Sequence, residues 1–225
     1  MPVPGSPGGA PARRLARDRA YDALKDAILT RTILPGERLD DDTLQAWLGM
    51  SKTPIRQALH ALTVEGFVET VAQSHTRVVE PRLEDAVANL QTIGVVVLGI
   101  LDFVFEELDE NERRELVGDL DVLIDALDRE DIEDSIAGSQ AYYARLMARC
   151  PNRVLVEFSA RTLAARAYYV MVAYRALEVK WGEAAAEYRL LRAAIEGGDG
   201  QAVADATKLV FRIGSPDTAI PKEAS

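Results

Sequence analysis

The segment between Ile33 and Pro81 constrains the fold most, because signals for two short helices are followed there by signals for two strands. Three aspartates at 40–42 offer an N-cap to the first helix, since short acidic side chains accept hydrogen bonds from free backbone amides. Gly49 predicts the end of that helix, because glycine adopts the left-handed C-cap conformation without steric cost.

A second helix is predicted directly after this turn. Ser51 is expected to cap it, and Pro54 falls in its first turn, where a missing amide hydrogen costs little. Gly66 marks its end. The helical period predicts a buried stripe consisting of Ile55, Ala58, Leu59 and Leu62. The same period turns outward Lys52, Thr53, Arg56, Gln57 and His60.

Two β-branched runs, FVETV and TRVVE, follow this helix and are separated by AQSH. Such runs around a short polar linker are typical of a β-hairpin. Two short helices followed by a hairpin make a winged helix-turn-helix, and a helix with cations and short polar groups near its N-terminus suits the major groove of DNA. The sequence therefore predicts DNA binding, with a winged helix used only for protein contacts as the alternative.

The runs LPGERL and SKTPIRQALHALTVEGFVE resemble the N-terminal domain of the GntR family of bacterial transcription regulators. This resemblance implies that the basic residue after the capping serine and the arginine four positions later contact DNA; these are Lys52 and Arg56. The family usually has arginine where this chain has Lys52, and lysine lacks the planar fork that reads guanine. The full set of expected DNA contacts is Arg38, Ser51, Lys52, Thr53, Arg56, Gln57 and His75.

The tip of the predicted wing departs from the family pattern. Where the family commonly has glycines, this chain has Gln73, Ser74 and His75. Histidine is bulkier than glycine, and we expect His75 to reach into the minor groove rather than to remain in solvent.

The charge of the chain divides unevenly along its length. Residues 1–82 hold 11 Lys/Arg and 10 Asp/Glu, a net charge of +1, whereas residues 83–225 hold 15 and 26, a net charge of −11. The acidic part would repel phosphate. We expect four regions: a disordered Pro/Gly-rich leader (1–14), the winged helix-turn-helix (15–81), an all-helical effector-binding and dimerisation domain (82–213), and a disordered tail (214–225).

The part after Pro81 is predicted to be entirely helical. Apolar-periodic segments fall at about 83–108, 111–129, 132–149, 154–177, 183–196 and 201–212, and the fourth is either one helix or two that divide near Ala173. The fold class is therefore mostly α: a winged helix-turn-helix followed by an all-α bundle of six or seven helices. The most apolar run, 93–105, is short for a bilayer and contains Asp102, so we interpret it as a buried helix and predict no membrane association.

The segments AYYARLMARCPNRVL and EYRLLRAAIEGGDGQAVADATKLV resemble parts of the helical effector domain in the FadR branch of the GntR family. Many members of that branch hold a divalent metal with an aspartate and three histidines. The matching positions here are Ser139, Tyr143, Tyr188 and Val210. None of them is a ligand of that kind, so the resemblance implies an effector domain without this metal and without a cofactor.

Histidine and tyrosine counts support that interpretation. The only histidines, His60 and His75, lie in the DNA-binding part, so the second part cannot build an imidazole metal site from this chain. Six of the seven tyrosines fall between positions 142 and 188, and tyrosine pairs an apolar face with a hydroxyl tip. We therefore predict a pocket for a small organic ligand, with tyrosines that plug the former cavity as the alternative. The expected ligand contacts are Ser139, Tyr142, Tyr143, Tyr188, Arg161 and Arg166, the arginines serving an anionic end of the ligand.

These observations predict a transcription regulator rather than an enzyme. No Glu-x-x-His pair, phosphate-binding glycine loop or histidine for a nucleophile is present after residue 82. Cys150 is the only cysteine, which excludes an intrachain disulfide and fits the cytoplasm. We predict a homodimer that binds an inverted-repeat double-stranded DNA operator and responds to a small effector. The alternatives are a ligand-independent dimeric regulator and a protein-interaction module that does not bind DNA.

Overall fold

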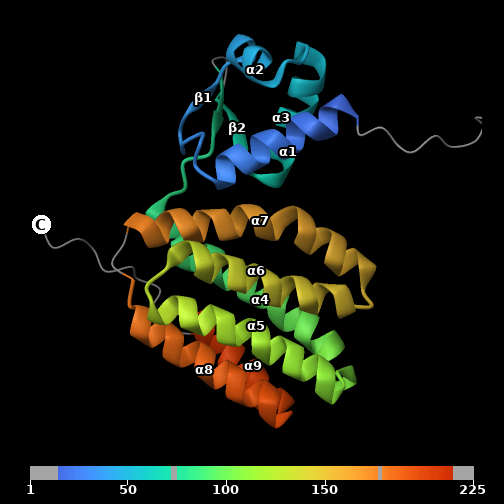
Figure 1. The fold of residues 1–225 in the computed structure, drawn as a ribbon, viewed down its shortest axis with the longest axis vertical. Coiled ribbons are helices and arrows are strands. Elements are labelled where there is room, and N and C mark those ends of the chain that lie inside the picture. Colours follow the sequence, from blue (N-terminus) through green and yellow to red (C-terminus); the bar gives the residue numbers. More distant parts are fainter. Residues whose placement is uncertain (1–14, 72–74, 177–178, 215–225) are drawn as a thin grey trace, which may run out of the picture. The chain divides into compact units, whose positions relative to one another are not determined.

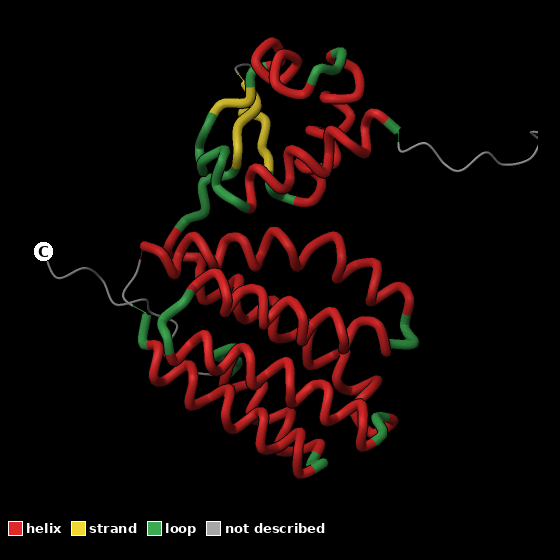
Figure 2. Tube along the Cα trace, viewed as in Figure 1, coloured by secondary structure: helices red, strands yellow, loops and turns green. Residues whose placement is uncertain are grey.

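The computed structural model describes residues 15–71, 75–176 and 179–214. It divides into two compact units, Met1–Glu80 and Pro81–Ser225 (Figure 1). Among the described residues, β-strands occur only in the first unit, and the second unit is built from helices (Figure 2). The predicted disordered leader and nearly all of the predicted tail lie outside the described residues.

The first unit is a winged helix-turn-helix. Its elements are α1 (Ala16–Leu29), β1 (Arg38–Leu39), α2 (Asp41–Leu48), α3 (Lys52–Glu65), β2 (Val68–Val71) and β3 (His75–Val78). The three strands form an antiparallel sheet in the order β1-β3-β2, with Val68 opposite Val78 and Arg38 opposite Arg77. The two-residue strand β1 was not predicted, because it is too short to show alternation in the sequence.

The ends of α2 and α3 follow the predicted capping residues, with one correction. The Asp40 carboxylate accepts hydrogen bonds from the amides of Asp42 and Thr43, and Gly49 ends α2 with φ of 64°. Ser51 occupies the N-cap position of α3, but its side chain makes no capping hydrogen bond. An N-cap side chain ordinarily accepts from the second or third amide of the helix, and the third residue here is Pro54, which has no amide hydrogen.

The core of the first unit forms where α3 packs on α1. The predicted stripe Ile55, Ala58, Leu59 and Leu62 is buried, as are Leu24 and Ile28 of α1. Two polar contacts also join these helices. The Lys25 ammonium lies 2.8 Å from the Glu65 carboxylate, and the Tyr21 hydroxyl donates to Glu65 at 2.6 Å. The packing fixes which side of α3 faces solvent.

The second unit contains six α-helices within its described residues. They are α4 (Ala86–Val104), α5 (Glu110–Asp128), α6 (Ile132–Arg149), α7 (Arg153–Ala176), α8 (Trp181–Gly197) and α9 (Gly200–Val210). The 3₁₀ turns Leu83–Asp85 and Phe105–Glu107 flank α4. Of the two alternatives for the fourth segment, the structure has the continuous helix, since α7 contains no glycine or proline and alanine is the strongest helix former.

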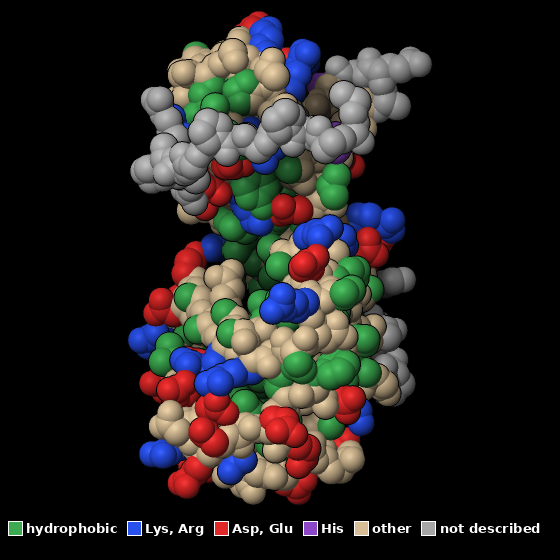
Figure 3. Space-filling model, turned by 90° about the vertical axis from the view of Figure 1, so that its right-hand side faces the viewer, with side chains coloured by type: hydrophobic (Ala, Val, Ile, Leu, Met, Phe, Trp, Pro, Cys, Tyr) green, Lys and Arg blue, Asp and Glu red, His purple; other side chains and the backbone are tan. Residues whose placement is uncertain are grey.

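Two glycines allow close approach between elements of this bundle. A Cβ atom at Gly138 of α6 would lie 2.9 Å from the Leu123 backbone of α5, and one at Gly94 of α4 would lie 2.3 Å from the Phe211 side chain. The core between the helices is apolar, and acidic and basic side chains are interspersed on the surface (Figure 3). Many of them pair between helices, as Arg145 does with Asp119 at 2.5 Å.

The helical stretch Leu83–Glu107 is long and apolar enough to cross a membrane by length and composition, with a mean hydropathy of 1.9 in its most apolar part. The expectation that this segment is too short concerned only residues 93–105 and does not hold for the whole stretch. A core helix of a soluble protein has the same properties. Because α4 packs against α6, α7 and α9 and buries Ile93, Val97 and Ile100, it is a core helix of this unit.

Candidate functional site

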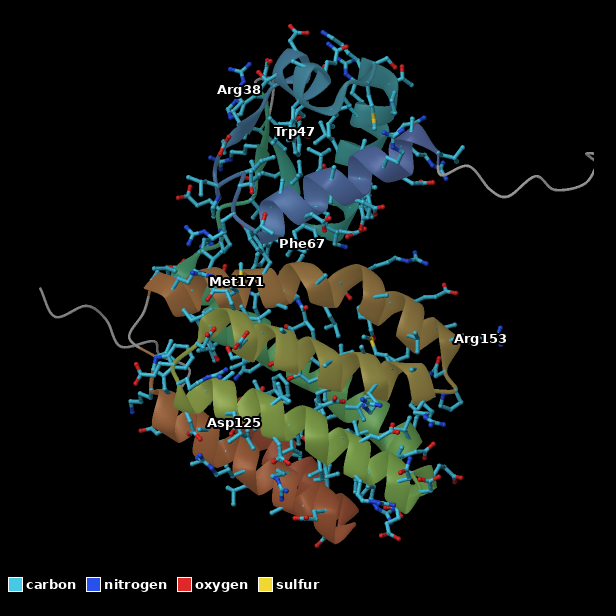
Figure 4. The ribbon with its side chains drawn as sticks, viewed as in Figure 1. Arg38, Trp47, Phe67, Asp125, Arg153 and Met171 are labelled. Atoms are coloured by element: carbon cyan, nitrogen blue, oxygen red, sulfur yellow. The ribbon has the colours of Figure 1, made fainter. Side chains whose placement is uncertain are left out.

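The outward face of α3 presents the residues that the sequence predicted for DNA contact. Lys52, Thr53, Arg56, Gln57 and His60 are all exposed, and the apolar stripe lies on the opposite side of the helix. Arg38 lies on β1, beside the start of α2 (Figure 4). This face therefore offers cations and short polar groups at one end of an exposed helix, as a major-groove reader does.

An aspartate lies near each of the three cations Arg38, Lys52 and Arg56. The Lys52 ammonium lies 2.7 Å from the Asp42 carboxylate, and the Arg56 guanidinium lies 2.6 Å from the Asp41 carboxylate. The hydrogen bond to Asp42 raises the pKa of Lys52. Asp40 has a lowered pKa, mainly because Thr43 donates hydrogen bonds to it and to a smaller extent because Arg38 is nearby. The acidic start of α2 thus balances the charge of the cations that are predicted to contact DNA.

An open groove of about 670 Å³ runs beside α3, where α1 begins. Arg17 and Tyr21 of α1 line it together with Arg56, Gln57 and His60 of α3. Arg17 and Tyr21 were not predicted as site residues, because no motif in the sequence marks the start of α1. The groove makes these two side chains neighbours of the predicted DNA contacts.

The hairpin formed by β2 and β3 is in the predicted place, but His75 is not at its tip. His75 is the first residue of β3, lies opposite Val71 and is half-buried. Gln73 and Ser74, which were also expected at the wing tip, lie outside the described residues. Because His75 belongs to the strand ladder, its side-chain direction is set by the sheet rather than by a loop.

A cavity of about 110 Å³ lies inside the helical unit. Its polar lining consists of Ser135, Ser139, Gln140, Tyr143, Tyr174 and Tyr188, and the remaining lining residues are apolar. The hydroxyl oxygens of Tyr143 and Tyr188 lie 3.3 Å apart and share a hydrogen bond. Two tyrosines from different helices, α6 and α8, thus meet at this cavity.

The cavity is uncharged. No Lys, Arg, Asp, Glu or His is found among its described lining residues. Burial raises the pKa of Tyr143 well above its ordinary value and raises that of Tyr174 to about 12. Burial also raises the pKa of Tyr188, against the opposing effect of its hydrogen bonds to Tyr143 and Ser139. The hydroxyls therefore remain neutral at physiological pH and can both donate and accept hydrogen bonds.

Two protein-family models match the chain in succession. The model described as "Bacterial regulatory proteins, gntR family" matches residues 16–78, and the FCD domain model matches residues 99–212. The second match alone covers half of the chain. The chain belongs to the GntR family, in its FadR-like branch. This GntR/FCD protein is a DNA-binding transcription regulator and not an enzyme, as the sequence predicted.

Two curated relatives resemble parts of this GntR/FCD protein. An HTH-type transcriptional regulator from an unstable DNA locus of Streptomyces ambofaciens is 33% identical over 99 residues, which are 43% of this chain and 41% of that protein. The Nta operon transcriptional regulator of Aminobacter aminovorans is 53% identical over 38 residues, which are 17% of this chain and 18% of that protein. The matches span less than half the length of either relative.

Solved structures with the same fold cover most of the chain. E. coli McbR/YncC is 21% identical with a TM-score of 0.69, over 88% of this chain and 94% of that one. A Rhodococcus sp. RHA1 protein described as a GntR regulator is 22% identical with a TM-score of 0.67, over 87% and 93% of the two chains. At this identity the likeness concerns the fold alone.

The FCD domain brings together most of the positions that the sequence resemblance aligned with the metal ligands of the branch. Ser139, Tyr143 and Tyr188 line the cavity, and Val210 is buried next to Phe211, which also lines it. Within the described residues, no group of three or more His, Cys, Asp or Glu side chains is arranged to hold a metal ion. The residues present do not fit the metal that the branch commonly binds.

Three of the predicted ligand contacts lie elsewhere in the FCD domain. Tyr142 is fully buried, is not among the cavity-lining residues, and its hydroxyl has no hydrogen-bond partner among the described residues. Arg161 is exposed and pairs with Glu157 one helical turn away. Arg166 donates to the Asn89 side chain at 3.0 Å. The rings of Tyr142 and Tyr143 pack edge to face, with centroids 5.3 Å apart, but only Tyr143 lines the cavity.

Several residues that line the cavity were not predicted from the sequence. Tyr174 and Met171 of α7 and Leu90 and Ile93 of α4 line the cavity together with Gln140 of α6. Tyr174 was visible as a member of the tyrosine cluster. The α4 residues carry no signal other than hydrophobicity, so they could not be separated from ordinary core positions.

Proposed function

We propose that this regulator changes its affinity for its operator when a small neutral organic molecule binds in the tyrosine-lined cavity of the FCD domain. The observation that supports this proposal most is the cavity itself. It lies at the positions where the branch holds a metal, and it has neutral hydroxyls there instead. A cavity at that place argues against tyrosines that fill it completely.

The lining indicates the chemistry of the ligand. An apolar wall with a few hydroxyl and amide groups favours a compact molecule that has an apolar body and one hydroxyl or carbonyl group. The expectation of an anionic effector depended on Arg161 and Arg166, and neither lines the cavity. At about 110 Å³ the cavity is smaller than most ligand pockets, which measure roughly 300–1,000 Å³. The ligand is therefore small, or its binding widens the cavity.

The proposed mechanism is a shift between two conformations. A ligand that binds one arrangement of the helical bundle more tightly raises the population of that arrangement. If the two arrangements place the winged helices of a dimer differently, operator affinity changes by the same coupling free energy. A ligand that binds both arrangements equally would leave operator affinity unchanged.

A homodimer on an inverted-repeat operator is part of this proposal. Large apolar side chains are exposed on α4 and α7, including Val95, Phe103 and Phe158. Gly99 of α4 lies beside Leu155 of α7, so these side chains belong to neighbouring stretches of two packed helices. Hydrophobic side chains are visible among charged ones on the face that contains the Arg153 end of α7 (Figures 3 and 4). We infer that a second copy of the chain covers them, since exposed apolar patches mark interfaces.

In the first unit, we retain as proposed DNA contacts the residues predicted from the sequence. All six that precede the wing, Arg38, Ser51, Lys52, Thr53, Arg56 and Gln57, are exposed. His75 is retained as a weaker candidate because it is half-buried at the start of β3. Regulation of transcription and a single buried cysteine fit a location in the cytoplasm.

A thermal-shift screen tests the ligand proposal. Neutral alcohols, ketones and phenols are compared with carboxylates, using wild type, Tyr143→Phe and Tyr142→Phe. A ligand at 100 times its Kd stabilises the fold by roughly 2.7 kcal/mol, which gives a rise of several degrees in Tm. We expect a neutral compound to produce this rise in wild type and in Tyr142→Phe, but much less in Tyr143→Phe, which lacks a hydroxyl at the cavity.

Tyr142→Phe is a matched control because it removes the same atom one residue away from the cavity. If only carboxylates stabilise the protein, or if Tyr142→Phe and Tyr143→Phe lose the shift equally, the proposed site is wrong. A protein whose operator binding is intact and which no compound stabilises would favour the ligand-independent regulator instead.

A further inference from the structure

Three consecutive aspartates stand at the start of α2, beside residues that we propose contact DNA. Acidic groups near phosphates weaken DNA binding, so their presence beside the recognition helix has a cost. Asp40 has an evident structural role as the N-cap of α2. Asp41 and Asp42 make no such capping contact, and each pairs instead with a cation of α3.

The contact of Asp41 with Arg56 orients the guanidinium group of Arg56. One carboxylate oxygen of Asp41 accepts from both Nε and Nη2 of Arg56, at 2.9 and 2.6 Å. The Asp41 side chain is 25% exposed, whereas the Arg56 side chain is 68% exposed. A half-buried anchor therefore holds the Nε and Nη2 edge of a planar guanidinium, while the Arg56 side chain as a whole remains mostly exposed.

The contact of Asp42 with Lys52 has a different character. Both side chains are well exposed, at 79% and 46%, and the ammonium is a point charge on a flexible stem. Such surface pairs fix little geometry. Asp42 therefore lowers the positive charge that Lys52 presents without orienting it.

We propose that Asp41 is a specificity-determining residue of this DNA-binding domain, which positions the Arg56 guanidinium for base reading, whereas Asp42 only reduces the affinity for DNA of any sequence. Reading a guanine requires the guanidinium fork to lie in the plane of the base. Asp41 sets that orientation before DNA binds, so less side-chain freedom is lost on binding. The inference rests on the proposed contact of Arg56 with DNA.

The chain provides a matched pair of substitutions. Asp41→Asn and Asp42→Asn remove the same charge from adjacent residues in the first turn of one helix. Full-length wild type and both variants would select duplexes from a random DNA pool. Their Kd for the wild-type consensus and for a scrambled duplex would then be measured by fluorescence anisotropy at several salt concentrations.

We expect Asp42→Asn to bind both duplexes more tightly and to keep the ratio of the two Kd values. Its salt slope should steepen by about one phosphate contact, since Lys52 becomes free. We expect Asp41→Asn to bind the scrambled duplex more tightly. Its ratio of scrambled to consensus Kd should fall about tenfold, as the loss of one oriented base contact would cause. A ratio within about twofold of wild type for Asp41→Asn would overturn the inference.

Arg56→Ala separates this inference from the contact on which it rests. If the Kd ratio falls in Arg56→Ala but not in Asp41→Asn, Arg56 contacts a base and the proposed role of Asp41 is wrong. If Arg56→Ala keeps the ratio, both are wrong. In the double variant Asp41→Asn/Arg56→Ala, we expect no loss of the ratio beyond that of Arg56→Ala, whereas an additive loss would show that Asp41 acts by another route. Unchanged Tm values confirm that the variants are folded.

Discussion

The two units of this chain place their candidate sites in opposite environments. In the first unit most of the proposed contacts are exposed polar or charged side chains at the start of α3, with Arg38 on β1 and the half-buried His75 on β3. In the second unit the cavity lies among the helices and is uncharged, and the five helices α4 to α8 contribute to it through residues far apart in sequence. A surface that reads a polyanion is encoded locally, whereas a cavity for a small molecule depends on how distant segments pack.

The largest effect of a single substitution on DNA recognition is expected at Arg56. Arg56→Ala should cost about 1–3 kcal/mol of operator binding and relax the sequence preference, because a bidentate base contact is lost. The helical unit should be unaffected, so the Tm of that unit serves as the control. Fluorescence anisotropy with operator and scrambled duplexes measures the effect. Wild-type operator affinity in this variant would remove Arg56 from the DNA-reading face.

A smaller and less selective effect is expected at Lys52. Lys52→Ala should weaken binding to operator and scrambled duplexes by a similar factor and reduce the salt slope by about 1, since an ammonium contacts phosphate rather than reading a base. Anisotropy titrations at several salt concentrations measure both quantities. If the variant loses operator binding selectively, Lys52 reads a base after all.

In the second unit, removal of the Tyr142 hydroxyl is not expected to destabilise the fold. Tyr142→Phe should change the free energy of unfolding by less than about 1 kcal/mol or increase it, because a buried hydroxyl without a hydrogen-bond partner already costs stability. Urea unfolding followed by circular dichroism measures this. A loss well above 1 kcal/mol would mean that the hydroxyl has a partner that stabilises the fold.

The smallest expected effect is that of metal removal. Treatment with EDTA should leave the Tm of the purified protein unchanged, because Ser139, Tyr143 and Tyr188 replace the ligands that the branch commonly uses. Elemental analysis of the same sample gives an independent measure. About one equivalent of zinc or nickel per chain would contradict the expectation, which rests on the absence of histidine from residues 83–225.

The contrast between the two units also explains what the sequence could predict. Caps, turn glycines and a 3.6-residue period act over a few residues, so Gly49, Gly66 and the buried stripe of α3 were predicted correctly. Ser51 was placed correctly, but its missing capping bond depends on Pro54 three positions later. The pairing of Lys52 and Arg56 with Asp42 and Asp41 was not foreseen, because it depends on the angle of the helix-turn-helix.

In the helical unit, the six helices could be predicted from their periodicity, but the cavity could not. A tyrosine cluster in the sequence does not show which rings border a cavity: the rings of Tyr142 and Tyr143 pack edge to face, yet only Tyr143 lines the cavity. The arginines were assigned to the ligand by proximity in sequence, although Arg161 faces solvent and Arg166 contacts Asn89. Such assignments require the packing angles of α6, α7 and α8, which no local signal encodes.

The most direct test of the central claim is the operator Kd of the full-length protein with and without a neutral compound that raises its Tm. The account predicts a change of about fivefold or more, the usual lower range of allosteric coupling, and a loss of that change in Tyr143→Phe but not in Tyr142→Phe. By reciprocity, operator DNA should alter the affinity for the compound by the same factor. A compound that binds at the cavity and stabilises the protein, yet leaves operator Kd unchanged, would contradict the claim that this cavity controls DNA binding.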